Sequence, residues 1–348
     1  MSLKDAIKAE ANQLGFVLFG VAPSASPPHY PAYQAWIRAG RQAGMAYLAR
    51  PVALTSRSTP EQLLPGCRSI LCVGLPYPPP LPPSAAEAEK DYGKIAAYAT
   101  LPDYHRILGD KLKALATRLP SLAGRVVRWR ACVDTAPILE KDYAFLAGLG
   151  WIGRNSLLLT PQFGSYVFLG ELLTNLELEP DQPLEGDPCA ACYQCVQACP
   201  THALLPERSV DARRCLSYWT IEHRGPLPES LRPLLGKRIF GCDSCQTACP
   251  LNAQPSPPGF AYAQNVVIEA YPDLLEAFNL SQEAWEAKYG QTPVTRAKYA
   301  GFRRNVAYAL GNAHVLQAEP LLQQAREQDP DPIVREACTW ALKQLKTY

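Results

Sequence analysis

Short apolar runs alternate with longer segments of helical periodicity over the first half of the chain. The apolar runs are bounded by turn residues, which is typical of buried strands. Segments 33–48 and 103–119, and a stretch from about 137, carry apolar residues at helical spacing. The sequence therefore predicts a mixed α/β, or α+β, domain over residues 1–185 whose strand order stays open, with strands at 16–23, 69–77, 125–133 and 165–178.

The pattern changes twice after this domain. Over 186–258 apolar residues become sparse and cysteine becomes frequent, which predicts a separate small domain. Residues 259–348 carry helical periodicity. Within them "RRNVAYALGNAH" (303–314) and "VREACTWALKQL" (334–345) share an Arg followed by Ala-Leu. This similarity predicts HEAT-like helical repeats, with two ordinary amphipathic helices as the alternative.

Composition narrows the class of protein. The chain has 348 residues, 47% hydrophobic and 19% charged, which is typical of globular proteins. Its net charge of +2 neither favours nor excludes a nucleic-acid partner. No apolar run is long enough to span a bilayer, and the first residues lack the apolar core of a signal peptide, so we expect a cytoplasmic protein without membrane contact.

Twelve cysteines in a cytoplasmic protein are unlikely to form disulfides, and eight of them fall between 189 and 249, which indicates metal. The run "CAACYQCVQACP" has the spacing C-x2-C-x2-C-x3-C-P of bacterial ferredoxins, which bind cubane [4Fe–4S] clusters. Three thiolates at two-residue gaps reach three irons of one cube. The fourth cysteine faces away and, in two-cluster ferredoxins, binds the other cluster.

A second set is present in altered form. "GCDSCQTACP" supplies three cysteines, and Cys215 is the free candidate for the missing fourth ligand. A four-thiolate zinc site is the competing interpretation, but zinc has no use for the C-P endings. The remaining cysteines, Cys67, Cys72, Cys132 and Cys338, lie in apolar segments as small buried residues. The predicted ligands are Cys189, Cys192, Cys195 and Cys249 for cluster one, and Cys199, Cys215, Cys242 and Cys245 for cluster two.

Clusters transport single electrons, so we expect the first domain to hold the group that uses them. "GLGWIG" (148–153) ends a helix instead of following a strand, so it predicts a turn and not a dinucleotide site. "DYHRIL" (103–108) approaches the D-x-H-x-x-G motif that gives cobalt a histidine ligand, but Leu108 replaces the glycine. Asp103 is then an N-cap and His105 a surface or pocket residue.

"CVDTAP" (132–137) places Asp134 after a strand and before a helix. In open α/β sheets ligands bind beyond the carboxyl ends of strands, where a buried carboxyl can act as a proton donor. The alternative is a helix cap.

Five motifs together resemble the epoxyqueuosine reductases, in order and over nearly the whole chain: "CVDTAP", "GRNSLLLTPQFGSYVFLGELLTN", the first cysteine run, "RRCLSYWTIE" and "GCDSCQTACPLN". The resemblance implies a base-off cobalamin between the first two domains, fed by two [4Fe–4S] clusters. The implied reaction reduces the epoxide of epoxyqueuosine to queuosine at the wobble position of tRNA, with Asp134 as proton donor. The implied corrin contacts are Arg57, Asp134, Leu158, Leu169, Ser217, Asp243 and Ser244. One departure is Leu101-Pro102, where the family often has Gly-Arg or Gly-Lys.

Residues 288–304 contain five cations and no acidic residue, beside three aromatic residues. This pattern suits an RNA backbone, although a solvated helix face has the same composition. The predicted tRNA contacts are Lys288, Arg296, Lys298, Arg303 and Arg304, with Tyr289, Tyr299 and Phe302 beside them.

Two other functions stay open on the residues alone. A reductive dehalogenase also combines cobalamin with two cubanes, but would have an export leader and no basic helical tail. A non-catalytic electron carrier would bind no cobalt. The resemblance further implies an external low-potential electron donor and a monomer.

Overall fold

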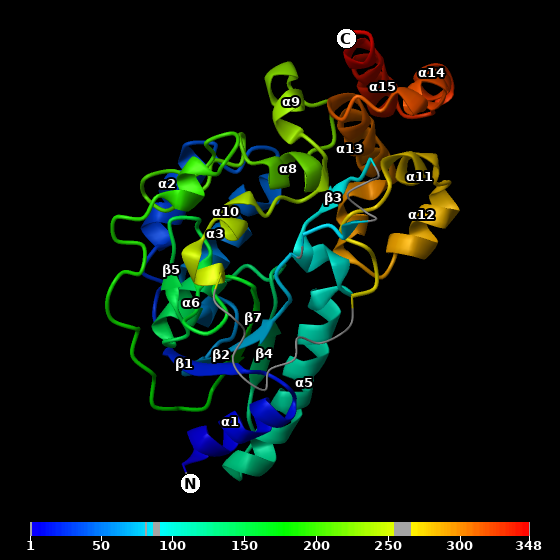
Figure 1. The fold of residues 1–348 in the computed structure, drawn as a ribbon. Coiled ribbons are helices and arrows are strands. Elements are labelled where there is room, and N and C mark those ends of the chain that lie inside the picture. Colours follow the sequence, from blue (N-terminus) through cyan, green and yellow to red (C-terminus); the bar gives the residue numbers. More distant parts are fainter. Residues whose placement is uncertain (1, 81, 86–90, 254–265, 348) are drawn as a thin grey trace.

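A four-stranded antiparallel sheet with strand order β1-β2-β7-β4 forms the centre of the first part of the molecule (Figure 1). The structure is a computed structural model that describes residues 2–80, 82–85, 91–253 and 266–347. Cys132 on β4 lies opposite Glu171 on β7, and Leu18 on β1 opposite Gly74 on β2. All four predicted strands are confirmed, with the bounds β1 (Leu18–Pro23), β2 (Ser69–Pro76), β4 (Trp129–Cys132) and β7 (Val167–Thr174).

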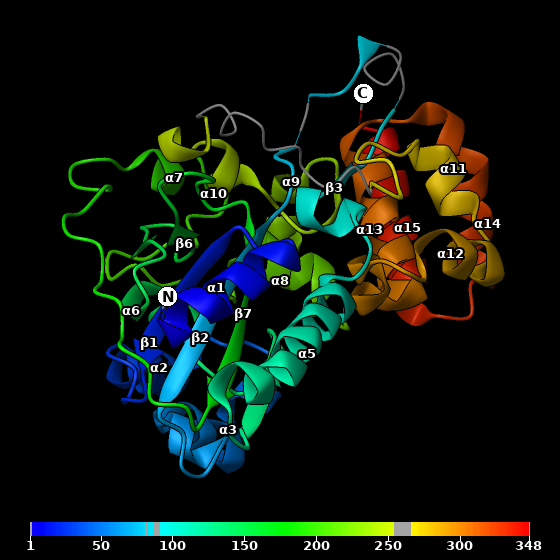
Figure 2. The ribbon, with the colours of Figure 1, turned by 90° about the horizontal axis from the view of Figure 1, so that it is seen from below.

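Helices cover both faces of this sheet (Figure 2). On one face α1 (Leu3–Gln13) and α5 (Tyr104–Ala123) bury side chains such as Ile7 and Leu112 against Leu172. On the other face α6 (Glu140–Leu146) lies so close to β1 that a Cβ on Gly20 would stand 2.2 Å from the carbonyl oxygen of Ala147. The predicted N-cap is confirmed, since Asp103 caps α5. A capping box formed by Ser2 and Asp5 opens α1.

The helix predicted over 33–48 is wrong in its extent. Helix α2 (Tyr30–Arg38) ends before Gly40, a turn with left-handed backbone at Gly40 and Ala43 follows, and α3 (Pro51–Ser58) begins later. Glycine adopts this backbone without strain, so it ends the helix despite the apolar periodicity. The turn predicted at 148–153 is confirmed by the left-handed Gly148, which leads into β5 (Trp151–Ile152), paired with β6 (Leu158–Leu159).

The cysteine segment and the C-terminal helices share one apolar core. Ile95, Leu216 and Phe240 pack with Phe302 and Val306 in this cluster. Strand β3 (Lys94–Ile95) pairs with β8 (Arg238–Phe240) in parallel, so part of the predicted first domain joins this second core. The other elements of the cysteine segment are α7 (Gln194–Gln197), α8 (Leu216–Ile221), α9 (Arg232–Leu235) and α10 (Ser244–Thr247).

The C-terminal part is helical, as predicted. The two similar segments lie mostly on α13 (Lys298–Asn312) and α15 (Pro332–Leu345), which pack against each other. The domain boundary predicted at residue 258 lies outside the described residues. Within them, no helix is long and apolar enough to cross a membrane. The helices are α11 (Leu274–Asn279), α12 (Gln282–Tyr289), α13 (Lys298–Asn312), α14 (Glu319–Gln328) and α15 (Pro332–Leu345).

Candidate active site

The cluster cysteines gather in the two predicted sets. Burial raises the pKa of Cys195, and the neighbouring Cys189, Cys249 and Cys192 raise it further. Burial likewise raises the pKa of Cys245, followed by its neighbours Cys242, Cys215 and Cys199. Thiolates this close repel one another, which destabilises the folded protein unless a bound metal cation neutralises their charge. The fold therefore brings Cys249 to the first run and Cys199 to the second.

These sets are not arranged around a single ion. Among the described residues, no three His, Cys, Asp or Glu side chains are close enough to hold one metal ion. Backbone amides point at two of the sulfurs: Arg154 donates to Sγ of Cys189 at 3.4 Å, and Ala203 donates to Sγ of Cys199 at 3.3 Å. Such N–H···S contacts stabilise negative charge on cluster ligands. The donor set thus fits iron–sulfur clusters.

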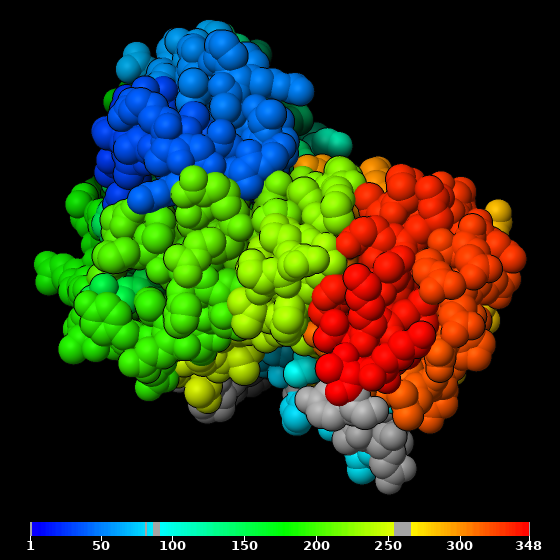
Figure 3. Space-filling model, turned by 90° about the horizontal axis from the view of Figure 1, so that it is seen from above, coloured from blue at the N-terminus to red at the C-terminus, as the bar shows by residue number. Residues whose placement is uncertain are grey.

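A cavity of about 1020 Å³ lies where the three parts of the chain meet. Figure 3 shows these parts adjoining on one face, with the middle of the chain in green and yellow between the blue N-terminal and red C-terminal residues. The cavity volume is at the upper end for small-molecule sites. Its walls include His105 and Asp134 from the first part, Cys215 and Ser217 from the cysteine segment, and Arg296 and Lys298 from the C-terminal part.

Asp134 lies in the turn between β4 and α6, with its backbone in the left-handed region at φ 37°. This conformation costs about 1 kcal/mol or more for a residue other than glycine, and such strain is found at functional sites. The predicted position is right but its reasoning is not, because the rule for strand ends applies to parallel sheets and this sheet is antiparallel. The helix-cap alternative is excluded, since α6 begins six residues later with Leu139 at its N-cap.

Three titratable side chains surround Asp134. His105 Nε2 lies 3.1 Å from Asp134 Oδ2. Glu140 accepts a hydrogen bond from the backbone N–H of Asp134, and burial followed by the charge of Asp134 raises the pKa of Glu140 to about 7. Glu171 on β7 is 0% exposed, and neither of its carboxyl oxygens has a hydrogen-bond partner in the described structure. Burial, then Glu140 and Asp134, raises the pKa of Glu171 well above its ordinary value.

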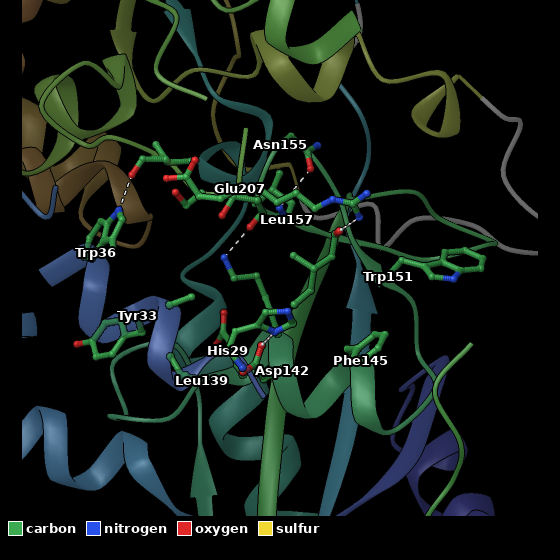
Figure 4. A pocket seen from close by; sticks show the side chains of 18 of the residues that line it. His29, Tyr33, Trp36, Leu139, Asp142, Phe145, Trp151, Asn155, Leu157 and Glu207 are labelled. Atoms are coloured by element: carbon green, nitrogen blue, oxygen red, sulfur yellow. Dashed lines mark hydrogen bonds and ion pairs between the residues drawn. The ribbon is translucent and has the colours of Figure 1, made fainter. Parts of the chain in front are cut away.

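A second cavity of about 650 Å³ shares Arg57 and Asp134 with the first. Figure 4 shows the second cavity with part of its lining, including Trp36, which also lines the first. Arg57 is 9% exposed and stands over the Tyr33 ring at 5.5 Å. One polar atom of the lining, Nδ2 of Asn155, is buried without a partner among the described residues. Buried polar groups ordinarily have hydrogen-bond partners, so this amide indicates a polar ligand. A corrin, with its amide-bearing side chains, fits that requirement.

The structure brings only some of the predicted corrin contacts to these cavities. Arg57, Asp134 and Ser217 line them. Leu158 and Leu169 do not, because both belong to the apolar core between the sheet and α6. Asp243 and Ser244 line a different cavity of about 590 Å³ beside Cys242. Asp243 there accepts a hydrogen bond from the backbone of Ala97 at 2.8 Å, and burial raises its pKa to about 6.

The predicted tRNA surface is wrong at Arg304. Its side chain is 0% exposed and donates hydrogen bonds to the backbone oxygens of Trp219, His223 and Gly225. The spacing of charges along α13 could not show that one cation points into the core.

Other members of that surface are engaged as well. Arg303 forms an ion pair with Asp329, and Lys288 pairs with Glu269. Tyr289 and Phe302 are core residues, so they are not available to stack on bases. Arg296 is exposed but paired with Glu222 at 2.8 Å, whereas Lys298 is exposed with no ion pair among the described residues.

Similarity to known proteins decides the family. Residues 57–135 match the family model "Epoxyqueuosine reductase QueG, DUF1730", and residues 188–252 match "4Fe-4S double cluster binding domain". An epoxyqueuosine reductase of Pseudomonas aeruginosa is 38% identical, covering 98% of this chain and 94% of the relative. The chain belongs to the epoxyqueuosine reductase family. The family resemblance predicted from the motifs is thereby confirmed.

Solved structures of epoxyqueuosine reductases share this fold. One, determined with an epoxyqueuosine-modified tRNA-Tyr stem loop, is 30% identical with a TM-score of 0.90, covering 99% of this chain and 90% of the other. Another, from Bacillus subtilis, has its aspartate-bearing catalytic loop swung out of the active site, with 30% identity, a TM-score of 0.88 and the same coverage.

Sequence reasoning gave no chemical role to three residues of this site. The motif around His105 does not fit a cobalt ligand, so the sequence assigns no role to the imidazole. The structure shows that Asp103, which caps the same helix, also forms a hydrogen bond with the imidazole of His105. Glu140 and Glu171 lie in ordinary helix and strand patterns. An acidic residue inside the apolar run "FLGELL" was the one available signal for Glu171.

Proposed function

We propose that this protein reduces the epoxide of epoxyqueuosine in tRNA to the alkene of queuosine. The observation that supports this most is the convergence of Asp134, the cluster ligand Cys215 and the exposed Lys298 on one cavity. A proton donor, an electron inlet and a cation for a phosphate backbone are the three components that this reaction on RNA requires. The near full-length similarity to epoxyqueuosine reductases gives the substrate.

The proposed electron path runs through two [4Fe–4S] clusters, held by the two cysteine sets described above. Cluster two is the one nearer the reaction, because its ligand Cys215 lines the cavity that contains Asp134. Cluster one is therefore the better entry point for electrons from an external low-potential donor. Cubane clusters suit this task because they supply electrons singly at low potential.

The two adjoining cavities are the proposed site of a base-off cobalamin. Arg57, Ser217, Ser209 and Asn155 would hold it, Asn155 through an amide nitrogen that otherwise lacks a partner among the described residues. When bound, cobalamin supplies a strongly reducing centre for the epoxide carbon.

Asp134 is the proposed proton donor to the epoxide oxygen. The strained turn directs its carboxyl into the cavity, where its side chain is 52% exposed and can meet a substrate. Glu140 holds the backbone of that turn by accepting the N–H of Asp134, which limits the carboxyl to a few positions.

The C-terminal helices are the proposed support for tRNA, through Arg296 and Lys298 at the mouth of the cavity. We also propose the domain division 1–185, 186–258 and 259–348, HEAT-like repeats in the last part, a monomer and a cytoplasmic location, where tRNA is modified. The packing of α13 on α15 supports the repeats, although the shared core with Ile95 and Phe240 makes the domain limits less sharp than the sequence pattern.

The deciding experiment is turnover of epoxyqueuosine-containing tRNA by protein reconstituted with iron, sulfide and cobalamin, followed by nucleoside mass spectrometry. Asp134→Asn should keep iron and cobalamin and lose about 10²–10⁴-fold in rate, the usual contribution of a general acid. Asp110→Asn, an exposed aspartate on α5, is the control. Near-normal turnover by Asp134→Asn would remove Asp134 from this role, and no turnover by the unmodified protein would reject the substrate.

A further inference from the structure

His105, on the first turn of α5, has a carboxylate at each ring nitrogen. Its Nδ1 lies 2.7 Å from Asp103 Oδ1, and its Nε2 lies 3.1 Å from Asp134 Oδ2. Asp103 is itself fixed, because the same oxygen caps α5 by accepting the backbone N–H of His105 at 3.0 Å. The imidazole also stacks on Tyr104, with ring centroids 4.2 Å apart, and Tyr104 stacks on Phe168. The ring is therefore held in one orientation.

An imidazole donates from both nitrogens only when it is protonated. The hydrogen bond with Asp103, followed by the one with Asp134, raises the pKa of His105 to about 9. Arg106 on the same helix acts on Asp103, and Glu140 on α6 faces the pair from the other side. The same cavity is also lined by Arg57, Lys298 and the paired Glu222 and Arg296. Lys141 on α6 and Glu171 on β7 act on Asp134 from behind the turn. His105 is thus a cation at neutral pH.

The proposed reaction needs more than one proton. Removing the epoxide oxygen as water consumes two electrons and two protons and forms the alkene. The electrons come from the external donor through the clusters, and the protons must come through the side chains at the cavity. Asp134 can hold a single proton, so it must be reloaded within one turnover.

We propose that His105 is the positioning residue that supplies Asp134 with protons. The Nε2 proton passes to Asp134 Oδ2, and Asp134 then gives that proton to the oxygen that leaves carbon. The neutral ring keeps its Nδ1 proton toward Asp103. An alkoxide or hydroxide is far more basic than imidazole, so the net transfer is downhill. The His105 side chain is 31% exposed, so water can restore its proton before the second delivery. Asp103 selects the tautomer that leaves Nε2 as the shuttling nitrogen.

This inference rests on the proposed function, and its first test does not depend on substrate. Histidine-labelled, cluster-loaded protein is titrated by NMR, with His105→Gln used to assign the signal. The expected pKa of His105 is near 9, falling toward 6.5 in Asp103→Asn and in Asp134→Asn. Asparagine is as good an N-cap as aspartate, so Asp103→Asn removes the charge and keeps the helix start. A His105 that titrates near 6.5 in the unmodified protein would overturn the proposal.

The second test measures turnover against pH. His105→Gln can still donate a hydrogen bond to Asp134 but has no proton to supply. For His105→Gln we expect a loss of about 10–10²-fold in kcat with an unchanged KM for tRNA. The decrease in rate above about pH 9 expected of the unmodified protein should be absent from the pH–rate profile of this variant. Added imidazole should partly restore the activity of His105→Ala. His314→Gln, on the exposed turn after α13, is the control. A wild-type rate and pH profile in His105→Gln would refute the proton supply.

The two tests separate this inference from the proposed function. If the unmodified protein does not convert epoxyqueuosine in tRNA, the substrate assignment fails while the titration still reports on the Asp103–His105–Asp134 chain. If turnover is normal and the titration shows an ordinary histidine, the proton supply fails and the function stands.

Discussion

Replacing Glu171 by glutamine should stabilise the protein, by an amount that grows as the pH rises. Glu171 is fully buried in the apolar layer between the sheet and α6, and burial raises its pKa well above 4.5. In the unfolded chain the same carboxyl ionises near 4.5. At pH values between these two pKa values the folded protein keeps a proton that the unfolded chain loses. The free energy of unfolding therefore falls with rising pH.

The size of this effect follows from linkage. One proton taken up on folding changes the free energy of unfolding by about 1.4 kcal/mol per pH unit. Glutamine has nearly the shape of the neutral acid and cannot ionise, so Glu171→Gln lacks this dependence. Over two pH units above about 5, the variant should gain about 2–3 kcal/mol on the wild type, and the gain should level off once the folded carboxyl ionises.

Urea unfolding at several pH values measures this difference, since contributions common to both proteins cancel when the two are compared. Glu177→Gln, an exposed glutamate just beyond β7, is the matched control and should follow the wild type. A Glu171→Gln difference that stays constant with pH would show that this carboxyl does not take up a proton on folding, and would refute the reasoning.

Two further predictions concern the clusters and the RNA surface. Cys215→Ala should lower bound iron from about eight to about four atoms per chain and leave cluster one intact, as measured by iron analysis and electron paramagnetic resonance. Cys338→Ala, which changes a buried cysteine on α15, is the control. Full iron content in Cys215→Ala would contradict the ligand assignment. Arg304→Ala should lower the thermal midpoint, because it leaves three backbone oxygens without their donor. Lys298→Glu should instead leave that midpoint unchanged and weaken tRNA binding in a salt-dependent way. Equal loss of stability in both variants would contradict a structural role for Arg304 and an RNA-binding role for Lys298.

The features that the sequence predicts correctly depend on local spacing. Cysteine gaps of two and three residues indicate how many thiolates one loop can present, and they predict the two groups of cysteines that the fold brings together. Cys215 has no such spacing and is predicted only as the remaining free cysteine. The strands follow equally from apolar runs between turn residues. Asp134 is indicated by its neighbours in a motif, although the antiparallel sheet gives it a different structural basis.

What could not be predicted depends on the direction of side chains in space. Arg304 and Lys298 look alike in a basic stretch, but helix rotation turns the first into the core and leaves the second at the cavity mouth. The role proposed for His105 depends on a contact with a residue 29 positions away, and no local pattern records such a contact. Leu158 and Leu169 carry motif positions whose side chains serve packing.

The pairing of β3 with β8 sets the order in which the molecule can be completed during synthesis. Lys94 on β3 can pair only after Arg238 has been synthesised. The first cysteine run likewise obtains its fourth ligand only when Cys249 is available. Neither cluster can therefore have all four ligands until most of the chain has left the ribosome. Until then the nascent chain carries exposed thiols and an unpaired strand, which are a risk for oxidation and aggregation. Cluster insertion is therefore a late event that locks together segments far apart in the sequence, and iron supply during growth should limit how much of the newly made protein reaches its final state.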